Sequence, residues 1–130
     1  MMQRSSALIA AKPGWLQDGL QAIVRAVPQI EGVDRADDGP SALRMIAEHP
    51  PALILLDVDL SGDGIQAVLR QIKTGWPQIQ CIVLVNNSQQ GQIISADGAD
   101  AVLVKGFSVT ALTETVAKLL SRIERMTGGH

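Results

Sequence analysis

Two uninterrupted apolar runs, at residues 52–56 and 81–85, most strongly constrain how this chain can fold. A strand covered on one face alternates apolar and polar side chains, whereas a strand covered on both faces is apolar throughout. Each run is five residues long, which suits a strand and is short for a helix. We therefore interpret both runs as central strands of a parallel sheet that is covered on its two faces.

Three further strands are expected on either side of these runs, and the segments between them have helical character. The expected strands are 6–11, 30–36 and 101–104, of which 30–36 is the weakest. Apolar residues at helical spacing predict helices over 16–27, from an entry at 38–41 to Pro50, over 65–75, and after Ser108, a plausible N-cap. The polar, Gly-containing stretch 86–92 leaves room only for a short fourth helix over 92–96.

Strands that alternate with helices over short connections predict a doubly wound α/β fold with a parallel sheet, because crossover connections are right-handed. The 130 residues carry no linker, repeat or low-complexity tract, so we interpret residues 1–130 as one domain with a core at about 6–123.

Composition excludes several classes of function. A net charge of −2 and three aromatic residues, Trp15, Trp76 and Phe107, argue against direct nucleic-acid binding, which needs clustered cations or stacking platforms. The single cysteine, Cys81, excludes an internal disulfide and is expected in the core rather than as a redox thiol. No apolar run is long enough to span a bilayer and no signal peptide is recognisable, so we expect a cytoplasmic protein without membrane contact.

Charged residues follow three of the expected strands. Lys12 follows the first, Asp57 the third and Lys105 the fifth, and Asp59 lies in the loop after Asp57. Because ligands of parallel α/β sheets gather at the carboxyl ends of the strands, this edge is the candidate site. A purely structural ion pair between Asp57 and Lys105 is an equally good reading of these positions.

Four segments in order resemble the receiver domain of bacterial response regulators. They are Pro51–Asp57, Asp63–Gly64, Gly98–Asp100 and Val102–Lys105, and the resemblance extends over about 6–123. It is greatest to receivers that precede a helix-turn-helix output domain. It implies a flavodoxin-like (β/α)5 sandwich of three layers and a role in phosphorelay signalling rather than as an enzyme.

The resemblance implies roles for individual residues. Asp57 would accept a phosphoryl group from a histidine kinase, and Lys105 would contact that group. In this family Mg²⁺ is held by an acidic pair after the first strand, by the acceptor, and by a backbone carbonyl that here belongs to Asp59. The acidic pair falls on Ala11 and Lys12, neither of which offers a side-chain oxygen. We therefore expect no cofactor beyond weakly bound Mg²⁺.

The family's switch positions also depart from its pattern. The hydroxyl residue after the fourth strand falls on Val85, next to Asn86, and the aromatic residue of the fifth strand falls on Val102. Gly106 stands where a proline usually follows the lysine. These departures predict a degenerate receiver that acts through protein–protein interaction.

In place of the metal, we expect Lys12 and Lys105 to lie on either side of Asp57 and to hold it ionised, although a solvated Lys12 is the commoner outcome for a loop lysine.

Expected partners are a histidine kinase or other signalling proteins. Trp15 either covers the sheet edge or anchors an interface. The final helix could also support a homodimer.

Two alternative functions stay open. One is an ordinary phosphorylation-driven receiver switch. The other is a small phosphatase, because the segment from Asp57 to Ser61 also resembles the nucleophile motif of haloacid-dehalogenase-like enzymes, in which a second aspartate two residues on serves as acid and base. Against the phosphatase, that motif lies on the first strand in such enzymes, whereas here it follows the third.

Overall fold

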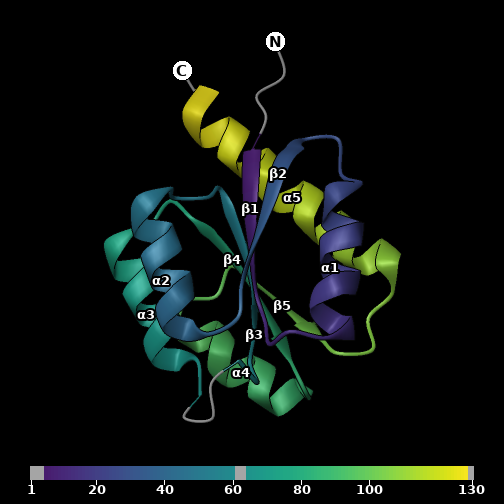
Figure 1. Ribbon diagram of the computed structural model, residues 1–130, viewed down its shortest axis with the longest axis vertical. Coiled ribbons are helices and arrows are strands. Elements are labelled where there is room, and N and C mark those ends of the chain that lie inside the picture. Colours follow the sequence, from purple (N-terminus) through teal and green to yellow (C-terminus); the bar gives the residue numbers. More distant parts are fainter. Residues whose placement is uncertain (1–4, 61–63, 129–130) are drawn as a thin grey trace.

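The computed structural model describes residues 5–60 and 64–128, with side chains as far as Ile123. One parallel sheet of five strands runs through its centre in the order β2-β1-β3-β4-β5 (Figure 1). The strands are β1 (Ser5–Ala10), β2 (Ile30–Ala36), β3 (Leu53–Asp57), β4 (Gln80–Val85) and β5 (Ala101–Val104). All five expected strands are confirmed, whereas Asp63 of the expected Asp63–Gly64 turn lies outside the described residues.

Five helices cover the two faces of the sheet, as the doubly wound fold requires (Figure 1). They are α1 (Trp15–Arg25), α2 (Gly39–Glu48), α3 (Gln66–Gly75), α4 (Ser88–Ala96) and α5 (Val109–Gly128). The core residues of α1 and α5 pack on one face, and those of α2, α3 and α4 on the other. The three-layer, flavodoxin-like architecture is confirmed.

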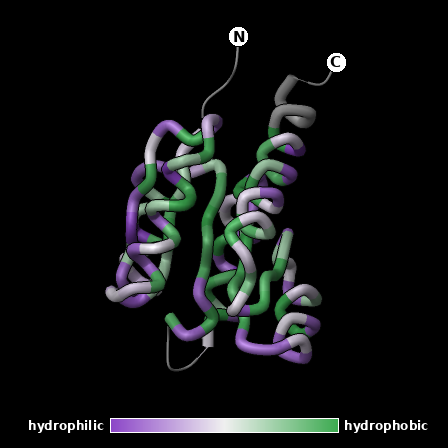
Figure 2. Tube along the Cα trace, turned by 90° about the vertical axis from the view of Figure 1, so that its right-hand side faces the viewer, coloured by the Kyte–Doolittle hydropathy of each residue, from purple (hydrophilic) through white to green (hydrophobic). Residues whose placement is uncertain are grey.

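The central strands are apolar throughout because each contributes to both cores. Leu53 and Leu55 of β3 face α1 and α5, while Ile54 and Leu56 face the opposite layer, and all four are fully buried. Full burial of a side chain of this size stabilises the fold by roughly 1.5–3 kcal/mol. Coloured by hydropathy, the chain is green along the interior strands and mixed along the helices (Figure 2).

Two helices begin at the expected caps. The Asp38 carboxylate accepts a hydrogen bond from the Ser41 amide at 2.7 Å, and Pro40 occupies the first turn of α2. The Ser108 hydroxyl likewise accepts a hydrogen bond from the Ala111 amide at 3.0 Å at the start of α5. Such caps satisfy backbone donors that a helix start leaves without a partner.

The prediction for the fourth helix is wrong at its start, since α4 begins at Ser88 rather than at residue 92. The Asn87 side chain caps it by accepting a hydrogen bond from the Gln90 amide at 2.9 Å. The Gln90 side-chain oxygen accepts in turn from the Asn86 amide at 2.6 Å. Polar capping therefore supplies the helix start, and apolar periodicity cannot detect it.

Most of the apolar stripe of α5 packs inside the domain. Leu112, Val116, Leu119 and Leu120 are buried against the sheet and α1 layer. Self-association through this helix stays a prediction.

Across the described parts of the chain, no helix combines the length and the hydropathy needed to cross a membrane.

Candidate functional site

Asp57 ends β3 and stands at the carboxyl edge of the sheet. Its neighbours along the strand are all buried, and Asp57 itself is only 6% exposed. The chain turns directly after it, because the Leu60 amide donates to the Asp57 carbonyl at 3.0 Å. The Asp59 amide donates to Asp57 Oδ1 at 3.1 Å. A buried carboxylate of this kind needs partners, and this amide is the first of them.

Lys105 is the second partner of Asp57. Its backbone amide continues the sheet by donating to the Val85 carbonyl at 2.8 Å, which places the side chain at the same edge. Lys105 Nζ lies 2.7 Å from Asp57 Oδ1 and 2.7 Å from Asp59 Oδ2. Partial burial, the largest single effect, lowers the Lys105 pKa, but the hydrogen bonds and the charges of both carboxylates together outweigh it and raise the pKa. One ammonium group therefore bridges two carboxylates.

Asp59 takes part through its side chain, whereas the resemblance to receivers assigned a role to its backbone carbonyl only. Besides Lys105, the carboxylate accepts from Asn86 Nδ2, at 3.1 Å to Oδ2 and 3.3 Å to Oδ1. The hydrogen bond from Lys105 and, less strongly, that from Asn86 lower the Asp59 pKa against the opposing effect of burial. The sequence signal for this contact is an acidic residue, Asp59, two positions after Asp57, together with a side-chain amide, Asn86, directly after the next strand.

Lys12 is brought to the same edge but not into contact. It is exposed, and among the described residues it forms no ion pair within 4 Å. Its charge still contributes, as the weakest of the causes, to the lowered Asp59 pKa. Lys105 thus contacts Asp57 and Lys12 does not, so the expected pair of lysines on either side of Asp57 is not formed by direct contacts. A longer-range effect of Lys12 on Asp57 stays a prediction.

Gln17 is a second residue that sequence reasoning missed. It is 3% exposed on α1. Its side-chain amide donates to the Ala11 carbonyl at 2.7 Å and to Asp37 Oδ1 at 2.9 Å. These bonds hold the segment after β1 against α1. The Ala11 side chain is buried there, and neither the Ala11 nor the Lys12 side chain contains an oxygen atom.

The described residues contain no cluster of three or more His, Cys, Asp or Glu side chains that could hold a metal ion. Within residues 5–60 and 64–128, the acidic side chain that joins Asp57 at Lys105 is that of Asp59, which is also bound to Asn86. At this edge, cations and amides therefore supply the partners of the carboxylates.

The expected switch positions Val85 and Val102 lie under α4. Val85 is fully buried and Val102 is half-buried. Gly91 lets the helix approach them closely, since a Cβ atom at this position would lie 3.1 Å from Val102 Cγ1 and 3.5 Å from Val85 Cγ2. Two valines of the sheet thus pack closely against a glycine of α4.

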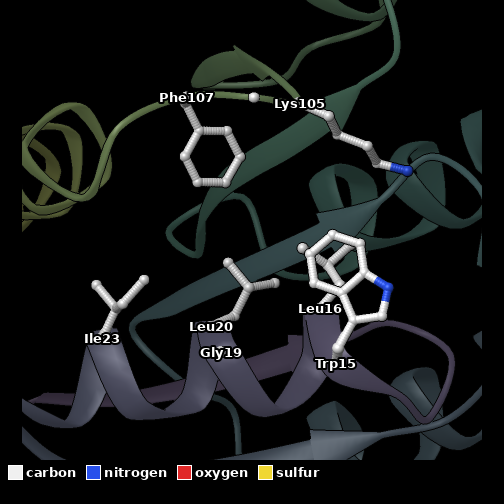
Figure 3. Close-up of a pocket in the computed structure, with 8 residues that line it drawn as sticks. Trp15, Leu16, Gly19, Leu20, Ile23, Lys105 and Phe107 are labelled. Atoms are coloured by element: carbon white, nitrogen blue, oxygen red, sulfur yellow. The ribbon is translucent and has the colours of Figure 1, made fainter.

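Beside the charged cluster, a groove of about 320 Å³ separates α1 from the loop after β5. Figure 3 shows Leu16, Leu20 and Ile23 on α1 facing Phe107 and Lys105 on the loop. Trp15 lines one part of the groove and is 85% exposed. Of the two roles considered for Trp15, covering the sheet edge is therefore excluded.

Comparison with known proteins agrees with this geometry. Residues 14–117 match the family model of the response regulator receiver domain. The chain is 32% identical over 116 residues to the transcriptional regulatory protein YhcZ of Bacillus subtilis, covering 88% of this chain and 51% of YhcZ. It is 33% identical over 94 residues to the chemotaxis protein CheY of Bacillus subtilis, covering 70% of this chain and 78% of CheY.

A solved structure supports the same assignment. The receiver domain of NtrX from Brucella abortus superimposes with a TM-score of 0.78 at 25% identity, covering 89% of this chain and 98% of that domain. The chain spans about half the length of YhcZ. From its sequence match over most of its length and its five-stranded fold, the chain belongs to the response regulator receiver domain family of two-component signalling.

Proposed function

We propose that this receiver domain is a cytoplasmic signalling module that acts by binding protein partners, and that Asp57 is not an efficient Mg²⁺-dependent phosphoacceptor. One observation carries the proposal. The resemblance places the metal-binding acidic pair at residues 11 and 12, where the structure has the buried Ala11 and the exposed Lys12, so Asp57 lacks the two neighbouring carboxylates that would hold Mg²⁺.

The oxygen ligands available to Mg²⁺ at this edge support the proposal. Mg²⁺ dehydrates reluctantly, requires near-octahedral geometry, and usually keeps several waters while it binds one or two carboxylates and other oxygen ligands. At this edge the segment after β1 contributes a buried methyl group from Ala11 and a second positive charge from Lys12. Asp57 and the Asp59 carbonyl alone would have to hold the ion beside two ammonium groups. This donor set does not suit Mg²⁺.

Phosphorylation with a small-molecule donor tests the proposal. The protein is incubated with acetyl phosphate, with and without Mg²⁺, and its intact mass is measured by mass spectrometry. We expect no adduct in either condition. A variant that carries Ala11→Asp and Lys12→Asp restores two carboxylates, and in it we expect Mg²⁺-dependent gain of one phosphoryl group. Adding Asp57→Asn to that variant should abolish the adduct.

A stable, Mg²⁺-dependent adduct on Asp57 of the unaltered protein would overturn the proposal. That outcome would establish the ordinary phosphorylation-driven switch. Isothermal titration calorimetry with Mg²⁺ alone separates binding of the metal from the chemical step. We expect measurable binding only after the two substitutions.

The groove between α1 and the loop after β5 is the surface that we propose for the partner, taken to be a histidine kinase or a related signalling protein. Exposed tryptophan in an apolar setting is typical of interface hot spots. Trp15 is 85% exposed beside Leu16, Leu20 and Phe107. The groove has apolar side chains at its base and the charged Lys105 at its margin, and protein interfaces commonly have such an apolar centre with a polar rim.

This surface is tested with recombinant histidine kinases and phosphotransfer proteins from the source genome. We expect at least one to bind, and Trp15→Ala to weaken that binding by about tenfold or more, as is typical of a hot spot. Val109→Ala is the matched control, because Val109 is 59% exposed and does not line the groove. Equal losses in both variants would contradict the assignment of the groove.

The phosphatase alternative has its own simple test. Asp59, the residue that would act as acid and base, is bound to Lys105 and Asn86. We therefore expect no hydrolysis of p-nitrophenyl phosphate above the level of the Asp57→Asn variant. Hydrolysis that depends on Asp57 would establish an enzyme.

A further inference from the structure

We propose that the Asp59 carboxylate is an internal anion that occupies an oxyanion site formed by Lys105 and Asn86, and that this occupancy holds the start of α4 in place. The inference deepens the proposed function, on which it rests for the absence of efficient phosphorylation. It assigns to the Asp59 side chain the regulation of the same site.

The contacts of Asp59 are those of a bound oxyanion. Its Oδ2 atom lies 2.7 Å from Lys105 Nζ and 3.1 Å from Asn86 Nδ2, and Oδ1 lies 3.3 Å from the same amide. An ammonium and an amide that converge on one pair of oxygens make charge-assisted hydrogen bonds of the kind that bind phosphate. The Asp59 side chain is 57% exposed, so solutes can reach this position from the solvent.

The two donors come from different elements, and Asp59 joins them. Lys105 follows β5, and Asn86 follows β4 directly before the cap of α4. Asp59 itself lies in the loop after β3. Its carboxylate therefore connects the carboxyl ends of three neighbouring strands across the part of the sheet next to α4.

Asn86 links the Asp59 carboxylate to α4 through hydrogen bonds. Its backbone amide donates to the Gln90 side chain at 2.6 Å, while its own side chain donates to Asp59. In the first turn of α4, Gly91 packs against Val102 and Val85, and a methyl group added to it would lie only 3.1 Å from Val102 Cγ1. A shift of Asn86 would therefore alter both the helix start and its packing on β5.

Removal of the Asp59 carboxylate should create a binding site for an external oxyanion. Asp59→Ala leaves the Asn86 amide without its acceptor and leaves Lys105 with Asp57 alone. It also makes the cluster more positive by one unit of charge. Inorganic phosphate is the probe, because its anionic oxygens can accept charge-assisted hydrogen bonds from both donors.

The experiment is a phosphate titration followed by ¹H–¹⁵N NMR, at constant ionic strength. In Asp59→Ala we expect saturable shifts of the Asn86 side-chain amide and of the Lys105 backbone amide. Binding should be about tenfold tighter than to the unaltered protein, the change that corresponds to one charge-assisted hydrogen bond. Without phosphate, the Gly91 and Val102 amides of Asp59→Ala should shift, and phosphate should return them toward their original positions.

Three controls make the result specific. Asp34→Ala removes an exposed carboxylate from β2, far from the cluster, and should bind phosphate no better than the unaltered protein. Asp59→Ala combined with Lys105→Met should lose the tight binding. Asn86→Ala keeps Asp59 in place and should by itself shift the Gly91 and Val102 amides, which tests the link to α4 if Asp59→Ala folds poorly.

Equal phosphate binding by Asp59→Ala and the unaltered protein would overturn the proposal, as would tight binding that survives Lys105→Met. Unchanged Gly91 and Val102 amides in both Asp59→Ala and Asn86→Ala would overturn the connection to α4. These results are independent of the acetyl phosphate experiment, which measures covalent modification of Asp57 in the protein with Asp59 intact. Failure of one proposal is therefore distinguishable from failure of the other.

Discussion

Gly91 of α4 packs on Val102 of β5 so closely that a methyl group added at Gly91 would come within 3.1 Å of Val102 Cγ1. A glycine inside a helix normally weakens it, since alanine is favoured there by about 1 kcal/mol. The contact with Val102 gives a reason for glycine at this position. It makes the pair a sensitive measure of how tightly α4 is held on the sheet.

We expect Gly91→Ala to destabilise the protein, because the added methyl group displaces Val102 or lifts the helix. In a Val102→Ala background the same substitution should stabilise, by up to about 1 kcal/mol, since the helix propensity then acts unopposed. Urea unfolding of the four proteins measures the coupling. The same effect of Gly91→Ala in both backgrounds would contradict it.

Asp100 forms a second, structural ion pair at the opposite edge of the sheet. One of its oxygens accepts hydrogen bonds from Lys73 Nζ at 2.9 Å and from the Cys81 amide at 2.8 Å, and its side chain is 18% exposed. We expect Asp100→Ala to lower the free energy of unfolding by about 2 kcal/mol, because charged hydrogen bonds of limited exposure are lost together.

The matched control for Asp100 is the exposed pair of Asp18 and Arg35. Their N···O distance is 3.0 Å, but the Asp18 side chain is 69% exposed. Asp18→Ala should therefore cost less than about 1 kcal/mol. Chemical denaturation compares the two variants directly, and equal losses would show that the environment of Asp100 is not the decisive factor.

Cys81 should be chemically inert in the folded protein. It is fully buried at the start of β4, and burial raises its thiol pKa to about 12. At pH 8 we expect no reaction with Ellman's reagent under native conditions and one reactive thiol per chain in denaturant. Rapid labelling of the native protein would mean that β4 opens locally.

The Asp38 carboxylate gives a pH dependence with a defined sign. Its hydrogen bonds with Ser41, first of all with the backbone amide, lower its pKa in the folded state. A carboxyl group whose folded pKa is depressed contributes stability above its unfolded pKa of about 3.9, and this is lost as the pH falls through the folded value. We expect the NMR titration of the Asp38 side chain to have its midpoint below the unfolded value of about 3.9, and the Ser41 amide to report the same midpoint.

The sheet could be predicted because its central strands are short, wholly apolar runs. Leu53 to Leu56 bury every side chain, and a run of this length between turn signals favours a strand covered on both faces over a helix. The start of α4 could not be predicted in the same way. Its first turn depends on hydrogen bonds among Asn86, Asn87 and Gln90, and polar side chains carry no periodic signal.

The candidate site divides in a similar way. That Asp57 and Lys105 share one edge follows from the order of the elements, because parallel strands end on the same side. That Lys105 also binds Asp59, while Lys12 lies apart, depends on loop and side-chain conformations that the strand order does not determine. Gln17 escaped notice because a buried glutamine on an amphipathic helix resembles any other polar residue until its partners are known.

The two members of the Asp57–Lys105 pair belong to strands of very different protection. Asp57 ends a central strand on which every residue is buried, whereas Lys105 follows β5, an edge strand of four residues that are only partly buried or exposed. Native-state hydrogen exchange should therefore detect opening of β5 well before that of β3. Transient fraying of one sheet margin would uncouple the ammonium from its carboxylates while the rest of the molecule stays folded.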